Sequence, residues 1–191
     1  MFETPEHATL LTPGETRGLI PSHIVYQHEL NAVEQNNIAR GQGWALARNR
    51  DVLNEKFVKE LHRRMLGDVW RWAGSYRKTE RNIGIEFWEI PVAVRQLLED
   101  AKTWIACRTY PVDETALRFH HRLVHIHPFP NGNGRHARLM ADLLVIRMGG
   151  LRFSWGRESL RDAGETRRRY ISALQAADRH EVEALLEFAR R

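Results

Sequence analysis

The stretch HIHPFPNGNGRHAR, residues 125–138, joins the two strongest helical patterns in the chain. Apolar residues at helical spacing precede it in residues 114–126, and a second helical pattern follows it in residues 135–150. Prolines end the first helix, and glycines make a tight turn before the second. Because the first N–H groups of a helix have no partner within it, and glycines let a ligand approach the backbone, this turn is a candidate anion site.

Three side chains add chemistry to this turn. Arg135 and Arg138 are three positions apart, so they share one face of the first helical turn, where two guanidinium groups beside backbone amides suit a polyphosphate. His127 stands just before the turn, and the near-neutral pKa of histidine makes it a natural proton acceptor. A glycine turn, an arginine pair or a lone histidine is commonly structural by itself. Together within residues 127–138 they indicate phosphoryl or nucleotidyl transfer.

The rest of the chain is predicted to be mainly α-helical. Helical spacing and capping residues predict helices over residues 22–40, 52–66, 91–108, 114–126, 135–150, 157–174 and 181–188. Residues 75–90 alternate weakly and contain Gly84, which predicts a short β-hairpin. The expected fold class is therefore mainly α, a helical bundle with a short β-hairpin flap beside the glycine turn.

The start of the chain differs from the remainder. Residues 1–48 form an irregular arm, punctuated by prolines and glycines, that carries one helix at about 22–40. Residues 49–191 form the main domain. A length of 191 residues agrees with one domain and an appended arm.

Composition excludes several classes of protein. The formal net charge of +5 fits an anionic partner, or none. No stretch approaches the ~20 apolar residues of a membrane span, and the acidic, proline-containing N-terminus is unlike a signal peptide. A lone cysteine, Cys107, excludes an internal disulfide framework. We expect a cytoplasmic protein that does not bind a membrane.

Two further clusters of residues contain side chains that could bind a ligand. His121 and His125 are four positions apart, a spacing that can bind zinc, but no cysteine or carboxylate nearby completes such a site. The arginines at residues 167–169 form a short run next to Glu165, which favours a solvated helix face over a nucleic-acid contact. We expect neither zinc nor nucleic acid as a partner.

The segment HPFPNGNGRHAR, residues 127–138, closely resembles the signature of the Fic family, HxFx(D/E)GNGRxxR. The matching positions are His127, Phe129, Gly132, Asn133, Gly134, Arg135 and Arg138. LHRRMLGDVWRWAGSYR (residues 61–77) and RNIGI (residues 81–85) resemble the family's helix-to-loop segment and its flap. The resemblance covers roughly residues 50–190 and implies a Fic-type helical bundle.

This resemblance implies a protein adenylyltransferase that transfers AMP from ATP to a Ser, Thr or Tyr hydroxyl of a target protein. His127 would be the general base that deprotonates the hydroxyl. Phe129 would be a buried anchor that holds the loop without touching substrate. The flap at Ile83, Gly84 and Ile85 would dock the target segment by strand-like pairing.

The same resemblance implies how ATP is held. Gly132, Asn133 and Gly134 would cradle the α- and β-phosphates. Arg135 would neutralise charge on the departing pyrophosphate, and Arg138 would hold the γ-phosphate. These roles agree with chemistry that depends on positioning and charge stabilisation.

One position departs from the signature. Asn131 stands where the family has Asp or Glu to hold Mg²⁺, and an uncharged oxygen binds a hard dication more weakly. Three interpretations follow: Mg²⁺ still binds, held mostly by the ATP phosphates; the phosphate-bearing substrate is not ATP; or the chain is a catalytically weak nucleotide-binding or regulatory module. His127 and the intact GNGR sequence argue against an inactive site.

The arm carries a degraded form of an inhibitory motif. Many Fic proteins have a helix with the pattern (S/T)xxxE(G/N), whose glutamate pairs with the second arginine of the signature. The matching glutamate here is Glu34, although Leu30 and Gln35 depart from the pattern. The resemblance implies a Glu34–Arg138 ion pair that occupies the γ-phosphate site. The alternative is a solvent-facing glutamate on an amphipathic helix.

Outside the main domain, LIPSHI (residues 19–24) and HELNAVEQNNIARG (residues 28–41) resemble a branch of the family called mobile mystery protein B. That branch is a bacterial group often paired with a helix-turn-helix protein. The resemblance therefore implies such a partner and, by analogy, a role in a toxin–antitoxin pair.

Overall fold

The computed structural model describes residues 11–156 and 163–191, and a mainly helical fold is confirmed there. The helices in these ranges are α1 (Pro13–Thr16), α2 (Gln27–Leu46), α3 (Glu55–Leu66), α4 (Ile90–Cys107), α5 (Val112–Ile126), α6 (Asn133–Arg147), α7 (Ala163–Asp178) and α8 (Glu183–Arg190). Each predicted helix overlaps one of α2 to α8. The beginning of the helix predicted at 157–174 and the first residues of the arm lie outside the described ranges.

The predicted β-hairpin at residues 75–90 is wrong. This segment consists of bends and turns, and the described ranges contain no strand, only one isolated bridge between Leu19 and Trp70. The cause is the way the segment's carbonyls are satisfied: those of Thr79 and Ile85 accept hydrogen bonds from the Arg77 side chain instead of from a neighbouring strand.

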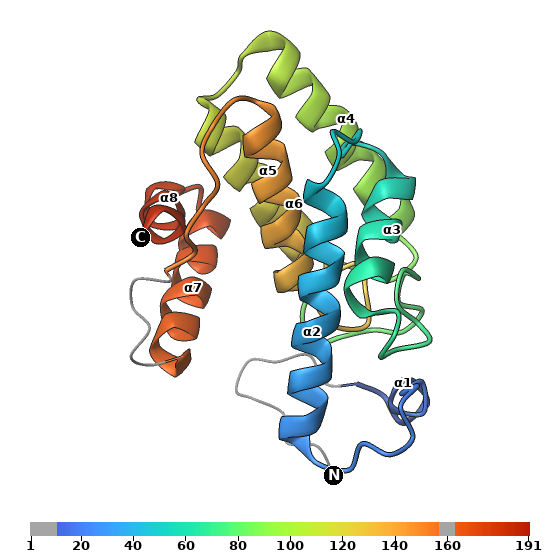
Figure 1. The fold of residues 1–191 in the computed structure, drawn as a ribbon. Coiled ribbons are helices and arrows are strands. Elements are labelled where there is room, and N and C mark those ends of the chain that lie inside the picture. Colours follow the sequence, from blue (N-terminus) through green and yellow to red (C-terminus); the bar gives the residue numbers. More distant parts are fainter. Residues whose placement is uncertain (1–10, 157–162) are drawn as a thin grey trace.

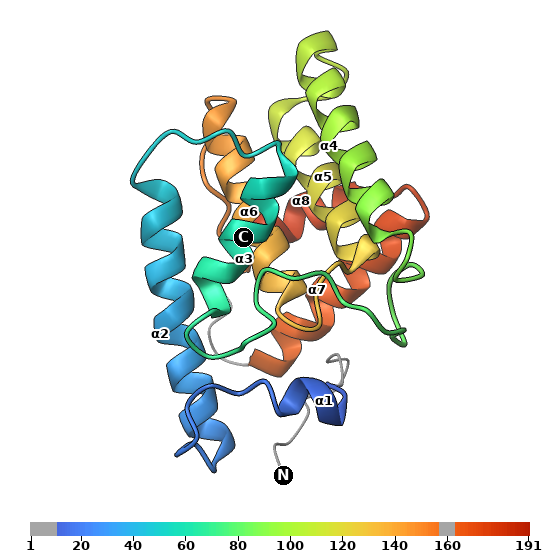
Figure 2. The ribbon, with the colours of Figure 1, turned by 90° about the vertical axis from the view of Figure 1, so that its right-hand side faces the viewer.

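Two helices form the centre of the molecule. Figure 1 shows α5 and α6 side by side, with α2 and α3 on one flank and α7 and α8 on the other. α4 packs on α5 and also contacts α3. The segment between α3 and α4 passes across the turn that joins α5 to α6 (Figure 2). The turn that carries the motif is therefore covered by segments from distant parts of the chain.

Large apolar side chains from both flanks meet at α5 and α6. The largest fully buried ones are Phe119, Phe129, Leu61, Met65, Leu66, Ile90, Leu97, Leu117, Leu123, Met140, Leu144 and Leu185. α3 contributes one strongly apolar face to this core, and its first turn is capped by Asn54, whose Oδ1 accepts the N–H of Phe57 at 2.8 Å. This burial is the main force that holds the turn in place.

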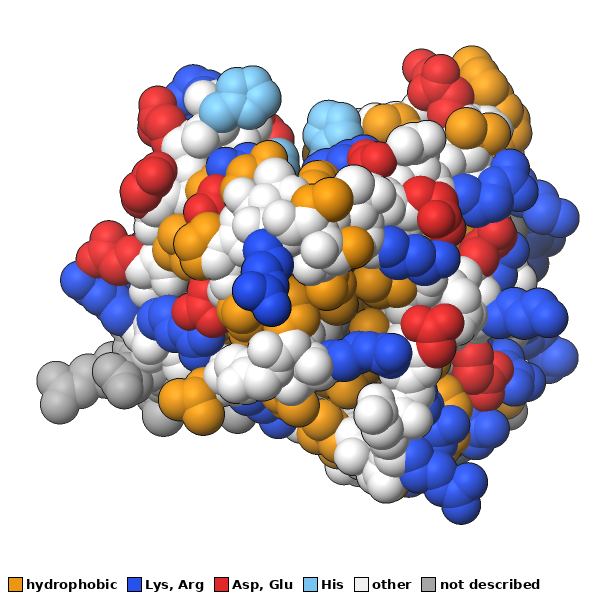
Figure 3. Space-filling view, turned by 90° about the horizontal axis from the view of Figure 1, so that it is seen from above, with side chains coloured by type: hydrophobic (Ala, Val, Ile, Leu, Met, Phe, Trp, Pro, Cys, Tyr) orange, Lys and Arg blue, Asp and Glu red, His pale blue; other side chains and the backbone are white. Residues whose placement is uncertain are grey.

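The surface has a mixed character. On the face in Figure 3, Lys and Arg side chains are interspersed with Asp and Glu around a central group of hydrophobic side chains. Among the described residues, no helix has both the length and the apolar character that a bilayer crossing requires.

Candidate active site

The turn between α5 and α6 is held in shape by hydrogen bonds made by the side chain of Asn133. Asn133 accepts the N–H of Phe129 at 2.9 Å through Oδ1 and donates Nδ2 to the Phe129 carbonyl at 2.8 Å. Phe129 itself is fully buried, as its predicted anchoring role requires. Gly132, at φ +78°, starts α6 in a backbone conformation that glycine adopts easily. The loop is thus a fixed frame at the start of α6.

His127 ends α5 at the edge of this frame and is only 6% exposed. Burial, followed by the positive charges of Arg77 and Arg81, lowers the pKa of His127 to about 4, although a hydrogen bond to the Val124 backbone opposes the shift. The imidazole is therefore neutral near pH 7. A neutral imidazole can accept a proton, which is the state that a general base needs.

His62 holds the loop from the other side, and the sequence analysis did not assign it a role. Its ring is fully buried and stacks on Phe129 with 3.7 Å between the ring centroids. Its Nδ1 accepts the N–H of Gly74 at 2.9 Å, so Nε2 carries the proton and donates to the Asn131 carbonyl at 3.0 Å. Burial holds the pKa of His62 well below its ordinary value, which keeps this tautomer neutral. The one available signal was a polar residue on the apolar face of α3.

The first turn of α6 begins directly after this loop, with Gly132 as its N-cap. A Cβ added to Gly134 would come no nearer than 3.6 Å to any neighbour, the Tyr170 hydroxyl. The N–H groups of a first helical turn lack partners within the helix, and they carry the positive end of its dipole. The structure places Gly132, Asn133 and Gly134 at this helix start, where the predicted phosphate cradle requires them.

Arg135 and Arg138 flank the first turn of α6 but face different helices. Nη1 of Arg135 lies 2.8 Å from Oε2 of Glu34 on α2, and the other oxygen of Glu34 accepts the Trp70 indole N–H at 2.7 Å. The guanidinium of Arg138 lies over the ring of Tyr170 on α7, 5.1 Å from its centroid. The expected Glu34–Arg138 pair is therefore wrong, because α2 passes on the Arg135 side of α6 and α7 on the other.

The segment predicted to dock the target lies directly beside His127. A Cβ added to Gly84, which has φ +94°, would be 2.6 Å from the Cβ of His127 and 3.0 Å from Nη2 of Arg77. Ile83 is 43% exposed, whereas Ile85 packs partly against the core. The structure thus brings the proposed base and the predicted docking segment into contact, although that segment is not a hairpin.

Asn131 offers little to a metal ion. Its Oδ1 accepts the N–H of Gly132 at 2.5 Å, and the described ranges contain no group of three or more His, Cys, Asp or Glu side chains placed so that they could hold a metal ion. His121 pairs with Asp178 at 2.8 Å, while His125 is exposed. One neutral oxygen, already engaged, does not fit a Mg²⁺ site made by the protein alone.

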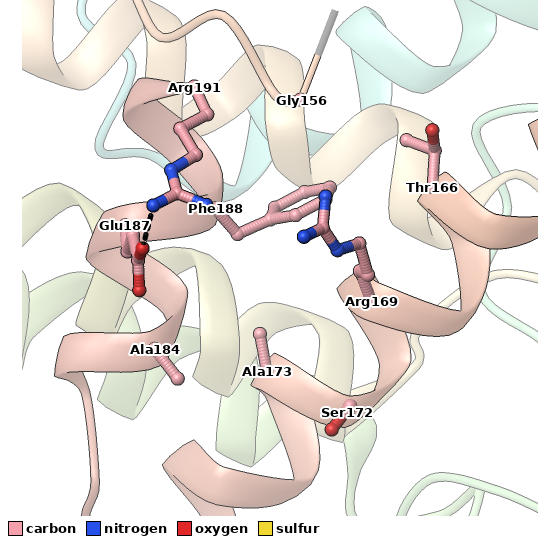
Figure 4. A pocket seen from close by; sticks show the side chains of 9 residues that line it. All are labelled: Gly156, Thr166, Arg169, Ser172, Ala173, Ala184, Glu187, Phe188 and Arg191. Carbon is pink, nitrogen blue, oxygen red and sulfur yellow. Dashed lines mark ion pairs between the residues drawn. The ribbon is translucent and has the colours of Figure 1, made fainter. Parts of the chain in front are cut away.

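A separate cleft of about 450 Å³ opens between α7 and α8. Figure 4 shows Phe188 between Arg169 and the Arg191–Glu187 ion pair. None of the predicted site residues lines this cleft. The candidate site is therefore the α5–α6 turn, with Glu34 from α2, Tyr170 from α7 and the segment around Gly84 as its walls.

Comparison with known proteins places the chain in a family. The family model described as Fic/DOC family matches residues 52–145, which include both the segment at 61–77 and the motif. The protein adenylyltransferase fic-1 of Caenorhabditis elegans is 30% identical over 152 residues, 73% of this chain and 29% of that protein. The protein adenylyltransferase Fic of Drosophila melanogaster is 29% identical over 150 residues, 73% of this chain and 30% of that protein. The chain thus spans less than a third of these curated relatives.

Solved structures show the same fold. Fic-1 of C. elegans (residues 134–508) superposes with a TM-score of 0.63 at 26% identity, covering 92% of this chain and 51% of that one. BepC of Bartonella tribocorum, solved with bound AMPPNP, superposes with a TM-score of 0.69 at 18% identity, covering 93% of this chain and 98% of that one. Motif, fold and sequence relatives agree, and the chain belongs to the Fic/DOC family, whose model matches residues 52–145.

Proposed function

We propose that this protein is a protein adenylyltransferase that transfers AMP from ATP to a Ser, Thr or Tyr hydroxyl of a target protein. The observation that carries the proposal is a neutral, buried His127 between the start of α6 and the segment around Gly84. A base, an anion cradle and a place for a protein segment meet there. The names of the sequence relatives in worm and fly support the same activity.

In the proposed reaction, His127 accepts the proton of the target hydroxyl. The hydroxyl oxygen attacks the α-phosphorus, the bond from that phosphorus to the α–β bridging oxygen breaks, and pyrophosphate leaves. Backbone N–H groups of Gly132, Asn133 and Gly134 hold the α- and β-phosphates. A low pKa makes His127 a weak base, which suffices because phosphoryl-type transition states form only a loose bond to the nucleophile.

The two arginines complete the proposed ATP site. Arg138, partly buried against Tyr170, would hold the γ-phosphate. Arg135 would stabilise charge on the departing pyrophosphate, but its guanidinium is engaged by Glu34. We therefore assign Glu34 a regulatory role, in which ATP phosphates must displace its carboxylate from Arg135.

In this proposal Mg²⁺ binds to the protein together with ATP. Since Asn131 supplies at most one neutral oxygen, ATP phosphates would provide most of the ligands to the ion. None of the roles proposed for the residues of this chain requires a metal ion bound to the protein alone.

A second candidate function is a catalytically weak nucleotide-binding or regulatory module. Asn131 in place of a carboxylate favours it, since a weakly held Mg²⁺ would slow the transfer step, and the Glu34–Arg135 ion pair favours a regulated site. A bacterial, cytoplasmic setting and a helix-turn-helix partner are proposed for both candidates, and a toxin–antitoxin role for this one. The bacterial setting, the partner and the role rest on the resemblance of residues 19–41, and the cytoplasmic location rests on the composition of the chain. The division into an arm (1–48) and a domain (49–191) is proposed for both candidates.

Label transfer distinguishes the two functions. The full chain is incubated with cell lysate and ATP labelled at either the α- or the γ-phosphate. We expect a labelled protein with α-label only, because AMP transfer leaves the γ-phosphate in pyrophosphate. His127→Ala should abolish the label, whereas His125→Ala, an exposed histidine two residues away, should keep it. ATP binding without any His127-dependent label would favour the second candidate.

A further inference from the structure

Arg77 lies outside the glycine-rich motif, in the segment between α3 and α4, and its side chain is fully buried. Nε donates to the His127 carbonyl at 2.8 Å, Nη1 to the Thr79 carbonyl at 3.1 Å and Nη2 to the Ile126 carbonyl at 3.5 Å. Nη2 also donates to the carbonyl of Ile85. One guanidinium thus joins the end of α5 to the segment that passes over it.

The positive charge of Arg77 is balanced mainly by the dipoles of the backbone carbonyls that accept its hydrogen bonds. Its only ion-pair partner among the described residues is Glu80, 3.9 Å away with a side chain that is 50% exposed. The last carbonyls of α5 carry the negative end of a helix dipole and lie directly against the guanidinium. Burying a charge in this way adds little net stability, because desolvation offsets the attraction. A buried arginine that bridges two segments is better explained by the geometry it imposes.

That geometry concerns the backbone of His127. His127 has φ +52°, a left-handed conformation that is unfavourable by about 1 kcal/mol or more for a residue with a Cβ. The Arg77 side chain holds the His127 carbonyl, and the Arg77 backbone N–H donates to the Pro128 carbonyl at 2.9 Å. These two bonds fix the peptide planes that follow His127 and so fix the direction in which its Cβ leaves the backbone.

The docking segment is held by the same group. Gly84 fits into the corner formed by the His127 Cβ, Arg77 Nη2 and the Ile126 carbonyl, where a Cβ would lie at 2.6, 3.0 and 3.2 Å from them. The carbonyl of the next residue, Ile85, accepts a hydrogen bond from Arg77. The position of the segment and the backbone that carries the imidazole are therefore held by one side chain.

We propose that Arg77 is a positioning residue that sets the distance between the docked target and the base, by holding the carbonyls of His127 and Ile85 at the same time. This inference rests on the proposed function. Arg77 does not reach the substrate itself and acts through His127 and the segment around Gly84. Its loss should impair transfer to protein and leave ATP binding intact, because the cradle at the start of α6 is held separately by Asn133 and His62.

The test uses three variants of the full chain. Arg77→Met removes charge and hydrogen bonds, and Arg77→Lys keeps the charge but loses the planar fork that reaches several carbonyls at once. Arg122→Met is the matched control, since Arg122 lies on α5 and pairs with Asp100 at 2.6 Å, away from the turn. Label transfer from α-labelled ATP and ATP affinity by calorimetry are measured for each.

Both Arg77 variants are expected to lose about 10- to 100-fold in label transfer at saturating ATP, since a displacement of about 1 Å can reduce a rate by that much. Their ATP affinity should stay within about twofold of the natural chain, as for Arg122→Met. If Arg77→Met does not fold, Arg77→Lys decides the question. Natural transfer rates in Arg77→Lys, or a parallel loss of ATP affinity, would overturn the proposal.

A second readout does not need activity. The His127 imidazole is titrated by NMR, with its signal assigned from His127→Asn. The pKa of His127 is lowered to about 4 in the natural chain, and the charged groups that face it are Arg77 and Arg81. Arg77→Met should move the pKa of His127 upward, toward its ordinary value, whereas Arg77→Lys and Arg122→Met should leave it low.

The titration also separates the two levels of inference. If the natural chain transfers no label, the proposed function fails, while an upward pKa shift confined to Arg77→Met still supports the contact between Arg77 and His127. An unchanged pKa in Arg77→Met would show that the guanidinium does not govern the surroundings of the imidazole. In that case the positioning role is wrong, whatever the activity.

Discussion

Glu34 and Arg135 are 101 positions apart in the sequence, and their side chains form an ion pair with 2.8 Å between Oε2 and Nη1. The Glu34 carboxylate is fixed further by the indole of Trp70. This pair ties α2 to the first turn of α6. It places a negative charge where the proposed function requires phosphate, so the ion pair and bound ATP compete for one guanidinium.

Removing that competition should raise ATP affinity. For Glu34→Gln we expect about a tenfold gain in affinity and a matching rise in label transfer at low ATP, because a charge-assisted hydrogen bond no longer opposes binding. Gln35→Ala, an exposed neighbour on α2, is the control. Glu34→Gly should act in the same direction, and equal rates across all ATP concentrations would contradict the assignment.

Asn131→Asp should lower the concentration of Mg²⁺ that activity requires. A carboxylate at this position supplies the charge that a hard dication prefers, so we expect half-maximal label transfer at about tenfold lower Mg²⁺. The measurement is a Mg²⁺ titration of transfer at fixed ATP. An unchanged midpoint would indicate that the nucleotide alone determines Mg²⁺ binding.

Gly84→Ala should reduce transfer by forcing the docking segment away from His127. The added Cβ would lie 2.6 Å from the His127 Cβ, and φ is +94°. Gly149→Ala is a matched control, since Gly149 has φ +83° but no atom within 4 Å of an added Cβ. Both variants should lose about 1 kcal/mol of stability from backbone strain. Only Gly84→Ala should lose activity, and equal activity in the two would refute the contact.

His62→Ala should lower the free energy of unfolding by about 2–4 kcal/mol. It leaves the Asn131 carbonyl and the Gly74 N–H without partners and opens a space beside Phe129. His62→Gln, whose amide can both donate and accept, should recover part of this loss. Urea denaturation checks both variants, and an equal loss in the two would argue that only ring packing matters.

Buried histidines should make the fold sensitive to acid. Burial lowers the pKa of His136 to about 4 and that of His120 to about 3, whereas in the unfolded chain both lie near ~6.5. The unfolded state therefore binds more protons below pH ~6.5, and stability present above that pH is lost as the pH falls toward 4. In His136→Gln, the amide can still donate to the Val58 carbonyl. The urea concentration at the unfolding midpoint should therefore change less between about pH 6.5 and pH 4 in this variant than in the natural chain.

The helices and the motif were predictable because their signals are local. Proline and glycine mark both ends of the turn at 127–134, and apolar spacing defines α3, α5 and α6. The positions of His127 and Gly84 relative to each other are new information from the structure. Spacing alone placed Arg135 and Arg138 on one helix start, yet their partners come from α2 and α7, which no local pattern reveals.

The errors have the same origin. Weak alternation in residues 75–90 predicted a hairpin, but a side chain at residue 77 supplies the hydrogen bonds that a strand partner would give. His62 was read as part of a helix, although its ring holds the Asn131 carbonyl 69 positions away. Some roles depend on a buried polar side chain that reaches a backbone atom far away in the sequence. Such roles leave almost no trace in the local sequence around either residue.

The acceptors of the Arg77 guanidinium in the segment at 79–85 are backbone carbonyls, which every amino acid supplies. Side chains along this segment can therefore change during evolution without weakening the hydrogen bonds from Arg77. Gly84 is the exception, since it has no room for a side chain. In such an arrangement the side chains of the segment determine which target is recognised, whereas its backbone determines where the target lies. New targets can therefore be acquired while the distance to the imidazole is inherited unchanged.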